Sequence, residues 1–122
     1  GSILSGFPRA QRLFGQDQFR AVLSTSAVER KCFVEVFVRP NQAGFARLGI
    51  VVGRKAVARA VDRNLCKRWV RERFRATHLE LAGLDVVVRF RPCRDKRTSR
   101  DARPEIYEVL SAIARCRDSL LA

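Results

Sequence analysis

The stretch VARAVDRNLCKRWVRERFRAT, residues 57–77, contains two four-residue repeats, and the predicted fold is built around the helix that they indicate. Side chains four residues apart lie one above the other on a helix. One repeat is apolar and is widened by neighbouring apolar residues: Val57, Val61, Leu65, Trp69, with Cys66 and Val70. The other repeat is cationic: Arg59, Arg63, Lys67, Arg71 and Arg75. The stretch therefore predicts one helix with an apolar face for the core and a positively charged face for a partner.

The segments on either side of this helix predict a small sheet. Three short runs rich in β-branched residues are expected to be strands: Phe33–Val38, Leu48–Val52 and Leu84–Phe90. A short helix is expected over Gln16–Leu23, and residues 3–15 and 92–103 are expected to be irregular. Pro104 suits the first turn of a last helix, which carries one apolar stripe: Ile106, Val109, Leu110, Ile113 and Leu120. This order predicts one sheet packed by helices, an α+β fold.

The charge of the chain favours a polyanionic partner. The 122 residues include 25 Lys and Arg but only 12 Asp and Glu, which leaves a net charge of +13. No apolar run approaches the roughly 20 residues of a membrane-spanning helix, so nucleic acid is a better candidate than a membrane. The length fits one domain. Gly1 and Ser2 are interpreted as a scar of recombinant expression, and residues 3–122 as the single domain.

Most of the excess charge lies between residues 47 and 75, which hold ten cations and two acids, a net +8. Like charges four residues apart on a helix repel each other by about 0.2–0.5 kcal/mol per pair. A solvated surface is one interpretation of such a face, but solvated helices usually mix signs. Phosphates would relieve the repulsion and release counterions. The face is therefore predicted to bind nucleic acid.

The residues offer little for catalysis by the protein itself. The four cysteines, Cys32, Cys66, Cys93 and Cys116, are far apart in the sequence, and His78 is the only histidine. We expect reduced, mostly buried thiols, no metal site and no catalytic residues. A stand-alone nuclease would need clustered carboxylates or an acid–base pair. A major-groove DNA reader would need a paired second helix, whereas a strand is predicted after residue 77.

Several motifs in fixed order resemble the bacterial ribonuclease P protein family. They are RLGIVVGRK at 47–55, RAVDRN at 59–64, KR at 67–68 and RE at 71–72. The N-terminal pieces FPR at 7–9, RL at 12–13 and QF at 18–19 are also similar to that family. The resemblance spans roughly residues 7–117. The family commonly has Arg-Asn-Arg where this chain has Arg63-Asn64-Leu65, so an RNA contact at Leu65 is in question.

The resemblance implies a fold that the residue pattern alone does not reveal. It implies the order α-β-β-β-α-β-α with a mixed sheet, like the second domain of ribosomal protein S5. It also implies a left-handed crossover around the basic helix, against the usual right-handed preference. The additional strand is expected between Thr25 and Arg30.

The resemblance also implies a function in which a catalytic RNA hydrolyses precursor tRNA and the protein assists. Mg²⁺ would be bound mainly by that RNA, the partners would be ribonuclease P RNA and precursor tRNA, and the location would be the cytoplasm. No membrane or dedicated protein partner is expected. The implied RNA-docking residues are Arg54, Lys55, Arg59, Arg63, Asn64, Lys67, Arg68 and Arg71. Candidates for binding the 5′ leader are Phe19, Phe33, Phe37, Arg9 and Arg12.

Two alternatives stay open at this point. Phe33 and Phe37 are expected to share a strand face with the charged Glu35, which makes them candidates for stacking on single-stranded bases. Packing in the core is the other interpretation for each. A basic RNA-binding module without a catalytic partner, such as a ribosomal protein, is the alternative function, because it shares the size and the charge.

Overall fold

A four-stranded mixed sheet forms the centre of the molecule. The computed structural model describes residues 20–25, 27–93 and 101–121. The strands are β1 (Glu29–Arg30), β2 (Val34–Pro40), β3 (Arg47–Val51) and β4 (Leu84–Phe90), in the spatial order β1-β2-β4-β3. Strand β2 is antiparallel to β1 and to β4, whereas β3 is parallel to β4. The predicted α+β class with a mixed sheet is confirmed, and β1 lies in the segment where the additional strand was expected.

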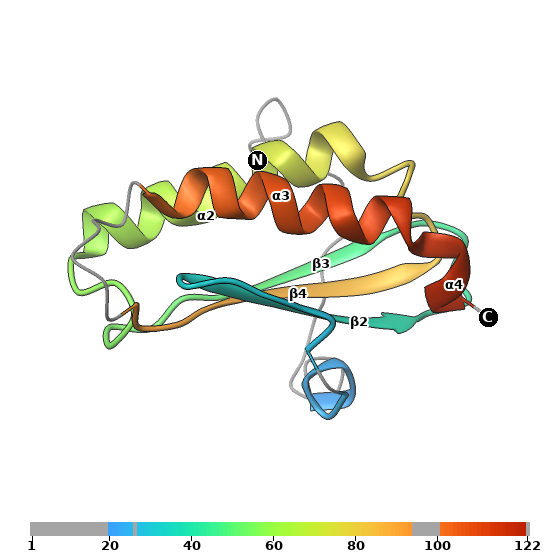
Figure 1. The fold of residues 1–122 in the computed structure, drawn as a ribbon, viewed down its shortest axis with the longest axis horizontal. Coiled ribbons are helices and arrows are strands. Elements are labelled where there is room, and N and C mark those ends of the chain that lie inside the picture. The colour runs from blue at the N-terminus through green and yellow to red at the C-terminus, as the bar shows by residue number, and fades with distance from the viewer. Residues whose placement is uncertain (1–19, 26, 94–100, 122) are drawn as a thin grey trace.

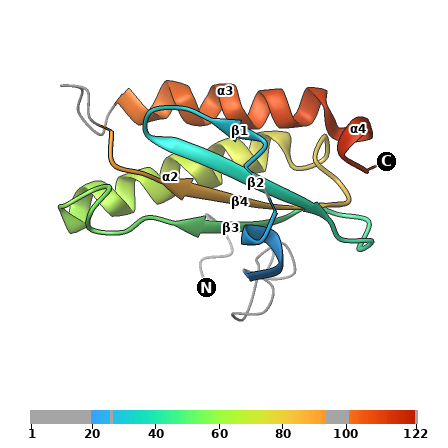
Figure 2. The same ribbon diagram turned by 60° about the horizontal axis from the view of Figure 1, so that its bottom comes forward.

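The connection between the two parallel strands is the long helix α2 (Ala60–Thr77). In Figure 2, β3 and β4 both run from right to left, β4 lies above β3, and α2 lies behind the sheet. Seen from the helix side with the strands pointing up, β4 is thus to the left of β3. The crossover is left-handed, as the resemblance implied, although right-handed connections strongly predominate in proteins.

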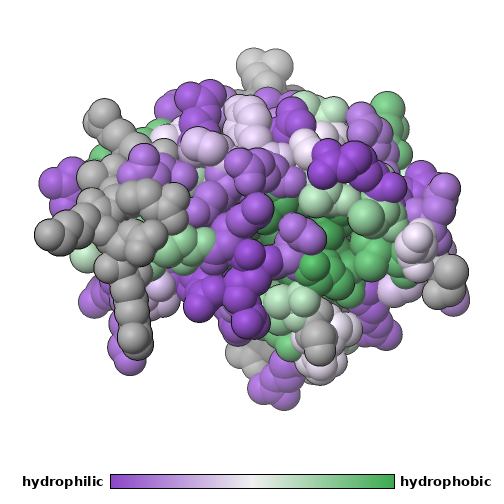
Figure 3. Space-filling view, viewed as in Figure 1, coloured by the Kyte–Doolittle hydropathy of each residue, from purple (hydrophilic) through white to green (hydrophobic). Residues whose placement is uncertain are grey.

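Two further helices, α3 (Ala102–Arg115) and α4 (Arg117–Leu121), cover the sheet on the same side as α2 (Figure 1). The main core lies between these helices and the sheet. On β2 it contains Val34, Val36 and Val38, the alternate residues of one strand face. The face seen in Figure 3 is largely hydrophilic, with an apolar area between α3, α4 and β2. No helix in the described residues is long and apolar enough to cross a membrane.

The opposite face of the sheet has a smaller apolar cluster. Residues 20–23 are helical and lie below the sheet in Figure 1. Val22 packs there with Phe37 of β2 and Val87 of β4, and all three are buried. Strand β4 therefore has apolar residues on both faces, because Val86 and Val88 belong to the main core. This explains its nearly continuous apolar sequence.

The predicted boundaries differ from the observed ones by a few residues. Helix α2 begins at Ala60 instead of Val57, because the amide groups of Ala56 and Val57 donate hydrogen bonds to the carbonyl of Gly53 and form a separate turn. The last helix is interrupted at Cys116, so the stripe residue Leu120 belongs to α4. Most of the helix expected at Gln16–Leu23 and the irregular segment 3–15 lie outside the described residues. The single-domain boundary stays a prediction.

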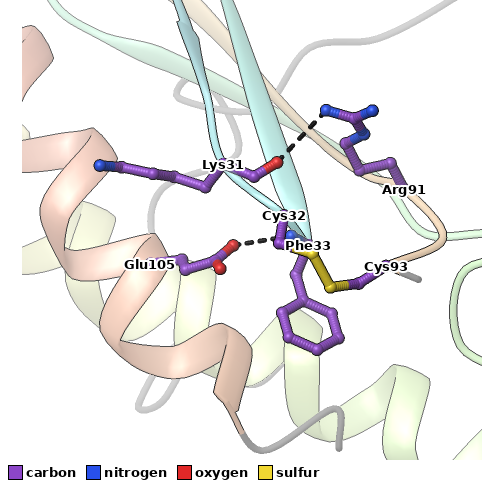
Figure 4. The surroundings of a disulfide bond; sticks show 6 residues. All are labelled: Lys31, Cys32, Phe33, Arg91, Cys93 and Glu105. Carbon is purple, nitrogen blue, oxygen red and sulfur yellow. Dashed lines mark hydrogen bonds between the residues drawn. A yellow bond between two sulfur atoms is a disulfide. The ribbon is translucent and has the colours of Figure 1, made fainter. Parts of the chain in front are cut away.

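The prediction of four reduced thiols is wrong for two of them. Cys32 and Cys93 form a disulfide, with Cα atoms 5.1 Å apart (Figure 4). Cys66 is a buried free thiol in α2, and Cys116 is an exposed one. The error arose because the spacing of cysteines in a sequence does not show which strand ends come together in space.

Candidate nucleic-acid interface

Helix α2 buries one side and exposes the other, but its apolar face differs from the predicted one. Cys66, Trp69, Val70 and Phe74 are buried against the sheet and α3. Val61, expected on the apolar face, is 65% exposed. Each four-residue step on a helix turns about 40° beyond a full circle. Val61 lies two such steps before Trp69, so its side chain points away from the core that Trp69 faces.

The exposed side of α2 forms a shallow hollow with a volume of about 730 Å³. It brings together four predicted RNA-docking residues: Arg59, Asn64, Arg68 and Arg71. Arg75 also lines the hollow, as do the acids Asp62 and Glu72. Arg59 forms an ion pair with Asp62, with the Arg Nε and Asp oxygen 3.1 Å apart. The remaining cations are in excess over Glu72, so the hollow is a positively charged surface.

Val61 and Leu65 form the apolar part of this hollow. Leu65 also packs partly against the main core. It stands where the related family commonly has arginine, so this part of the surface offers an aliphatic side chain instead of a cation. The hollow therefore combines charged groups with an apolar patch.

The second and third cations of the predicted row, Arg63 and Lys67, do not line the hollow. Both are only partly exposed. The Arg63 Nη1 group donates hydrogen bonds to the carbonyl of Val57, at 3.0 Å, and to that of Ala58, at 2.7 Å. Arg63 thus holds the turn that precedes α2. Arg54 and Lys55, the other two predicted docking residues, are exposed within the turn itself, which starts at Gly53.

A second group of arginines lies on the sheet face opposite α2 and α3, around Glu35. This residue is only 5% exposed. Arg30 Nε lies 2.9 Å from one carboxylate oxygen, and Arg89 Nε lies 2.8 Å from the other. Burial raises the pKa of the Glu35 carboxyl, but the hydrogen bonds from Arg89 and Arg30 outweigh this effect and hold it below its ordinary value of 4.5.

The aromatic residue next to this group is Phe37. The Arg89 guanidinium carbon lies 4.9 Å from the centre of the Phe37 ring, in cation–π contact. Phe33 lies elsewhere, because it precedes β2 and belongs to the main core together with Val34. The expectation that Phe33 and Phe37 share a face is therefore wrong. Both residues are only 5% exposed. Phe19, Arg9 and Arg12 lie outside the described residues, and their roles stay predictions.

The sequence pattern did not predict that Glu35 and Arg89 form an ion pair. The strand register would have shown this, because the two residues face each other across β2 and β4. A similar arrangement occurs across β3 and β4, four residues earlier on β4, where Asp85 is 5% exposed and accepts two hydrogen bonds from Arg47, at 2.7 and 3.0 Å. Arg47 contributed to the charge counted from the sequence, but its guanidinium has an internal partner.

Comparison with known proteins identifies the family. The family model for ribonuclease P matches residues 7–114. The ribonuclease P protein component of Chromobacterium violaceum is 41% identical over 113 residues, which cover 93% of each chain. That of Ralstonia pickettii is 38% identical over 116 residues, covering 87% of this chain and 83% of the relative.

Solved structures with the same fold carry the same name. The ribonuclease P protein of Staphylococcus aureus superposes with a TM-score of 0.72 at 25% identity, covering 85% of this chain and 95% of that one. The ribonuclease P protein of Thermotoga maritima gives a TM-score of 0.63 at 31% identity, covering 90% and 94%. From sequence, motif order and fold together, the chain belongs to the ribonuclease P protein component family.

Proposed function

We propose that this chain is the protein subunit of a ribonuclease P ribonucleoprotein and that the exposed face of α2 docks on its catalytic RNA. The observation that carries this proposal is the hollow in which Arg59, Arg68 and Arg71 gather with Asn64. Arginine guanidinium groups bind phosphates through paired donors, and an asparagine amide can bond to a base edge or a ribose. Lys55 and Arg54, exposed just before the helix, extend the same surface.

In this proposal the RNA subunit carries the chemistry, and the protein supplies no catalytic residue. The RNA would hold most of the Mg²⁺, which supplies a metal-activated water for phosphodiester hydrolysis. The described residues contain no group of three His, Cys, Asp or Glu side chains that could hold a metal ion. The complex would act in the cytoplasm, where precursor tRNA is processed.

The sheet face opposite α2 is proposed to bind the 5′ leader of precursor tRNA. Arg89 is 42% exposed on that face, is held by Glu35 and covers the ring of Phe37. A fixed guanidinium plane can stack on a base and also contact a phosphate. Phe19, Arg9 and Arg12 are proposed to extend this surface, on the strength of the family resemblance alone.

Reconstitution tests the main proposal. A bacterial ribonuclease P RNA is incubated with precursor tRNA at low Mg²⁺, with and without this protein, and release of the 5′ leader is measured. Cleavage should be strongly stimulated by the protein, and protein alone should cleave nothing. Binding to ribosomal RNA together with no effect on cleavage would instead favour a basic RNA-binding module of another kind.

A pair of matched variants tests the leader-binding face. Phe37→Leu removes the ring beneath Arg89 while keeping an apolar side chain. Phe74→Leu makes the same change at a fully buried position of the main core. The first variant should weaken holoenzyme binding to precursor tRNA more than binding to mature tRNA, whereas the second should affect both equally. Phe19→Ala should behave like Phe37→Leu. Equal losses for both substrates in Phe37→Leu and Phe19→Ala would remove the leader assignment.

A further inference from the structure

We propose that Cys32 and Cys93 are a site of reversible oxidation, at which the protein exchanges its disulfide with small thiols such as glutathione. The two residues are separated by 61 positions in the sequence, yet their Cα atoms are 5.1 Å apart. Figure 4 shows the bond where the start of β2, the end of β4 and α3 come together. The proposal concerns this bond and does not depend on how the protein contacts RNA.

The backbone brings the two cysteines together independently of the bond. The ladder between β2 and β4 ends with the pair Val34 and Phe90. Beyond it, the amide of Arg91 donates a 2.8 Å hydrogen bond to the carbonyl of Phe33. The Arg91 side chain also donates to the carbonyl of Lys31, at 3.3 Å. These contacts hold both backbone segments in place, so the thiols of the reduced protein stay within reach of each other.

Helix α3 also holds the backbone next to Cys32 in place. The carboxylate of Glu105, in its first turn, accepts a 2.7 Å hydrogen bond from the amide of Phe33. The Phe33 ring packs in the main core. Cys32 is therefore directly bonded to a residue that is anchored both to α3 and to the core. This arrangement favours an internal disulfide over separate modification of each thiol.

Exposure distinguishes this pair from the two other cysteines. Cys32 and Cys93 are both partly exposed, so a small disulfide or thiol can reach them. Cys66 is fully buried, and burial, together with the negative charge of Asp62, raises its pKa to about 11. It therefore stays protonated and unreactive at neutral pH, because the thiolate is the reactive form. Cys116 is exposed and free, so it can form a mixed disulfide or a disulfide between two protein molecules.

The exchange conserves atoms and electrons. The thiolate of one cysteine attacks a sulfur of oxidised glutathione, which forms a mixed disulfide and releases one glutathione thiolate that takes up a proton. The thiolate of the second cysteine then attacks the protein-side sulfur and releases the second glutathione. Two electrons pass from the protein dithiol to the glutathione disulfide. Reduction by excess glutathione follows the same steps in reverse.

Closing this bond restrains a large part of the chain. The loop between the two cysteines contains β2, β3, α2 and β4. A cross-link over a loop of that length reduces the freedom of the unfolded chain and raises the melting temperature, by on the order of 10 °C. Disulfides in a reducing compartment are usually transient or redox-sensing. The cytoplasmic location in the proposed function therefore favours a reversible bond, whereas the bond itself follows from the fold.

The experiment uses full-length Cys116→Ser protein, so that the exposed thiol cannot contribute. The protein is equilibrated in buffers with varied ratios of reduced to oxidised glutathione, alkylated, digested and mapped by mass spectrometry. One internal link between the peptides of Cys32 and Cys93 should form and disappear reversibly across the series. The oxidised form should melt about 10 °C above the reduced form. Neither result requires RNA, so failure of this proposal can be distinguished from failure of the RNA-binding proposal.

A second variant serves as the control. Cys32→Ser in the Cys116→Ser background should melt at the same temperature in oxidising and reducing buffer. If this variant does not fold, the comparison of the two redox forms of the Cys116→Ser protein still decides the question. Mixed glutathione adducts at Cys32 and Cys93 without an internal link would overturn the proposal. Equal melting temperatures of the oxidised and reduced forms of the Cys116→Ser protein would also overturn it.

Discussion

The exposed face of α2 and the opposite face of the sheet both carry arginines, but in different surroundings. On the sheet, Arg89 and Arg47 are bonded to Glu35 and Asp85, two carboxylates that are each 5% exposed. On α2, Arg68 and Arg71 are exposed around a hollow. An arginine held by a buried carboxylate contributes to stability and local geometry and, where it is as exposed as Arg89, can still contact a ligand. Exposed cations of one sign contribute mainly to association with a polyanion, and that contribution weakens with salt.

The largest effect should come from the double variant Arg68→Ala and Arg71→Ala. Losing two charge-assisted contacts should weaken assembly with ribonuclease P RNA roughly 100-fold. The slope of log affinity against log salt should become shallower by about 1.5 to 2. Binding measured over a series of KCl concentrations checks both values. Arg39→Ala, which removes an exposed cation at the end of β2, is the control and should leave the slope unchanged. An unchanged slope in the double variant would contradict the assignment of α2.

On the sheet face, removing the carboxylate that holds the arginines should lower the stability of the protein. Glu35→Gln removes the charge between Arg30 and Arg89 and should lower the free energy of unfolding at pH 7 by about 1–3 kcal/mol. Because the pKa of Glu35 is lowered in the folded protein, its contribution is present above pH 4.5 and is lost as the pH falls through the folded-state pKa. The difference between wild type and variant, measured by urea unfolding, should therefore narrow in acid.

A matched surface change controls for the loss of one negative charge. Glu108→Gln removes a carboxylate that is 61% exposed and paired with Lys31 at 3.1 Å. Exposed ion pairs contribute little, so this variant should lose less than about 1 kcal/mol. Equal destabilisation by both substitutions would show that the buried position of Glu35 does not matter.

Arg63 allows the comparison to be made within α2 itself. Its guanidinium bonds to the carbonyls of Val57 and Ala58. Arg63→Ala should therefore lower the free energy of unfolding by about 1 kcal/mol. It should change the salt slope of RNA binding less than Arg68→Ala does. Both expectations are checked by measuring thermal melting and the salt dependence of RNA binding for the two variants. A larger change of the salt slope in Arg63→Ala than in Arg68→Ala would mean that Arg63 leaves the carbonyls and binds the RNA.

The smallest effect is expected at Leu65. Leu65→Arg places a cation in the hollow, at the position where the family commonly has one, and should make the salt slope steeper by about 0.9. Leu65→Gln is the control, because it is polar but uncharged, and should leave the slope unchanged. The same slope for both variants would show that position 65 does not face the RNA phosphates.

Much of the fold could be predicted from the sequence because its signals are local. The strand Leu84–Phe90 was predicted with its observed bounds, and α2 was predicted to within three residues at its start. Along this strand, Val86 and Val88 lie in the main core and Val87 in the smaller cluster, as the two-residue period of a strand requires. The cationic surface was visible too, since a helix has a known period. The left-handed crossover came only from the family resemblance, because no local pattern encodes the handedness of a connection.

The sequence by itself determined the elements, the charge of α2 and the family of this protein. The tertiary structure decided which partners the charged and sulfur-containing groups have. Arg63 turns back to the backbone, Arg89 meets Glu35 across the sheet, and Cys32 meets Cys93 over 61 positions. The physical reason is range: helical and strand periods arise from neighbours a few residues apart, whereas these pairings depend on strand register and on how the helices pack against the sheet.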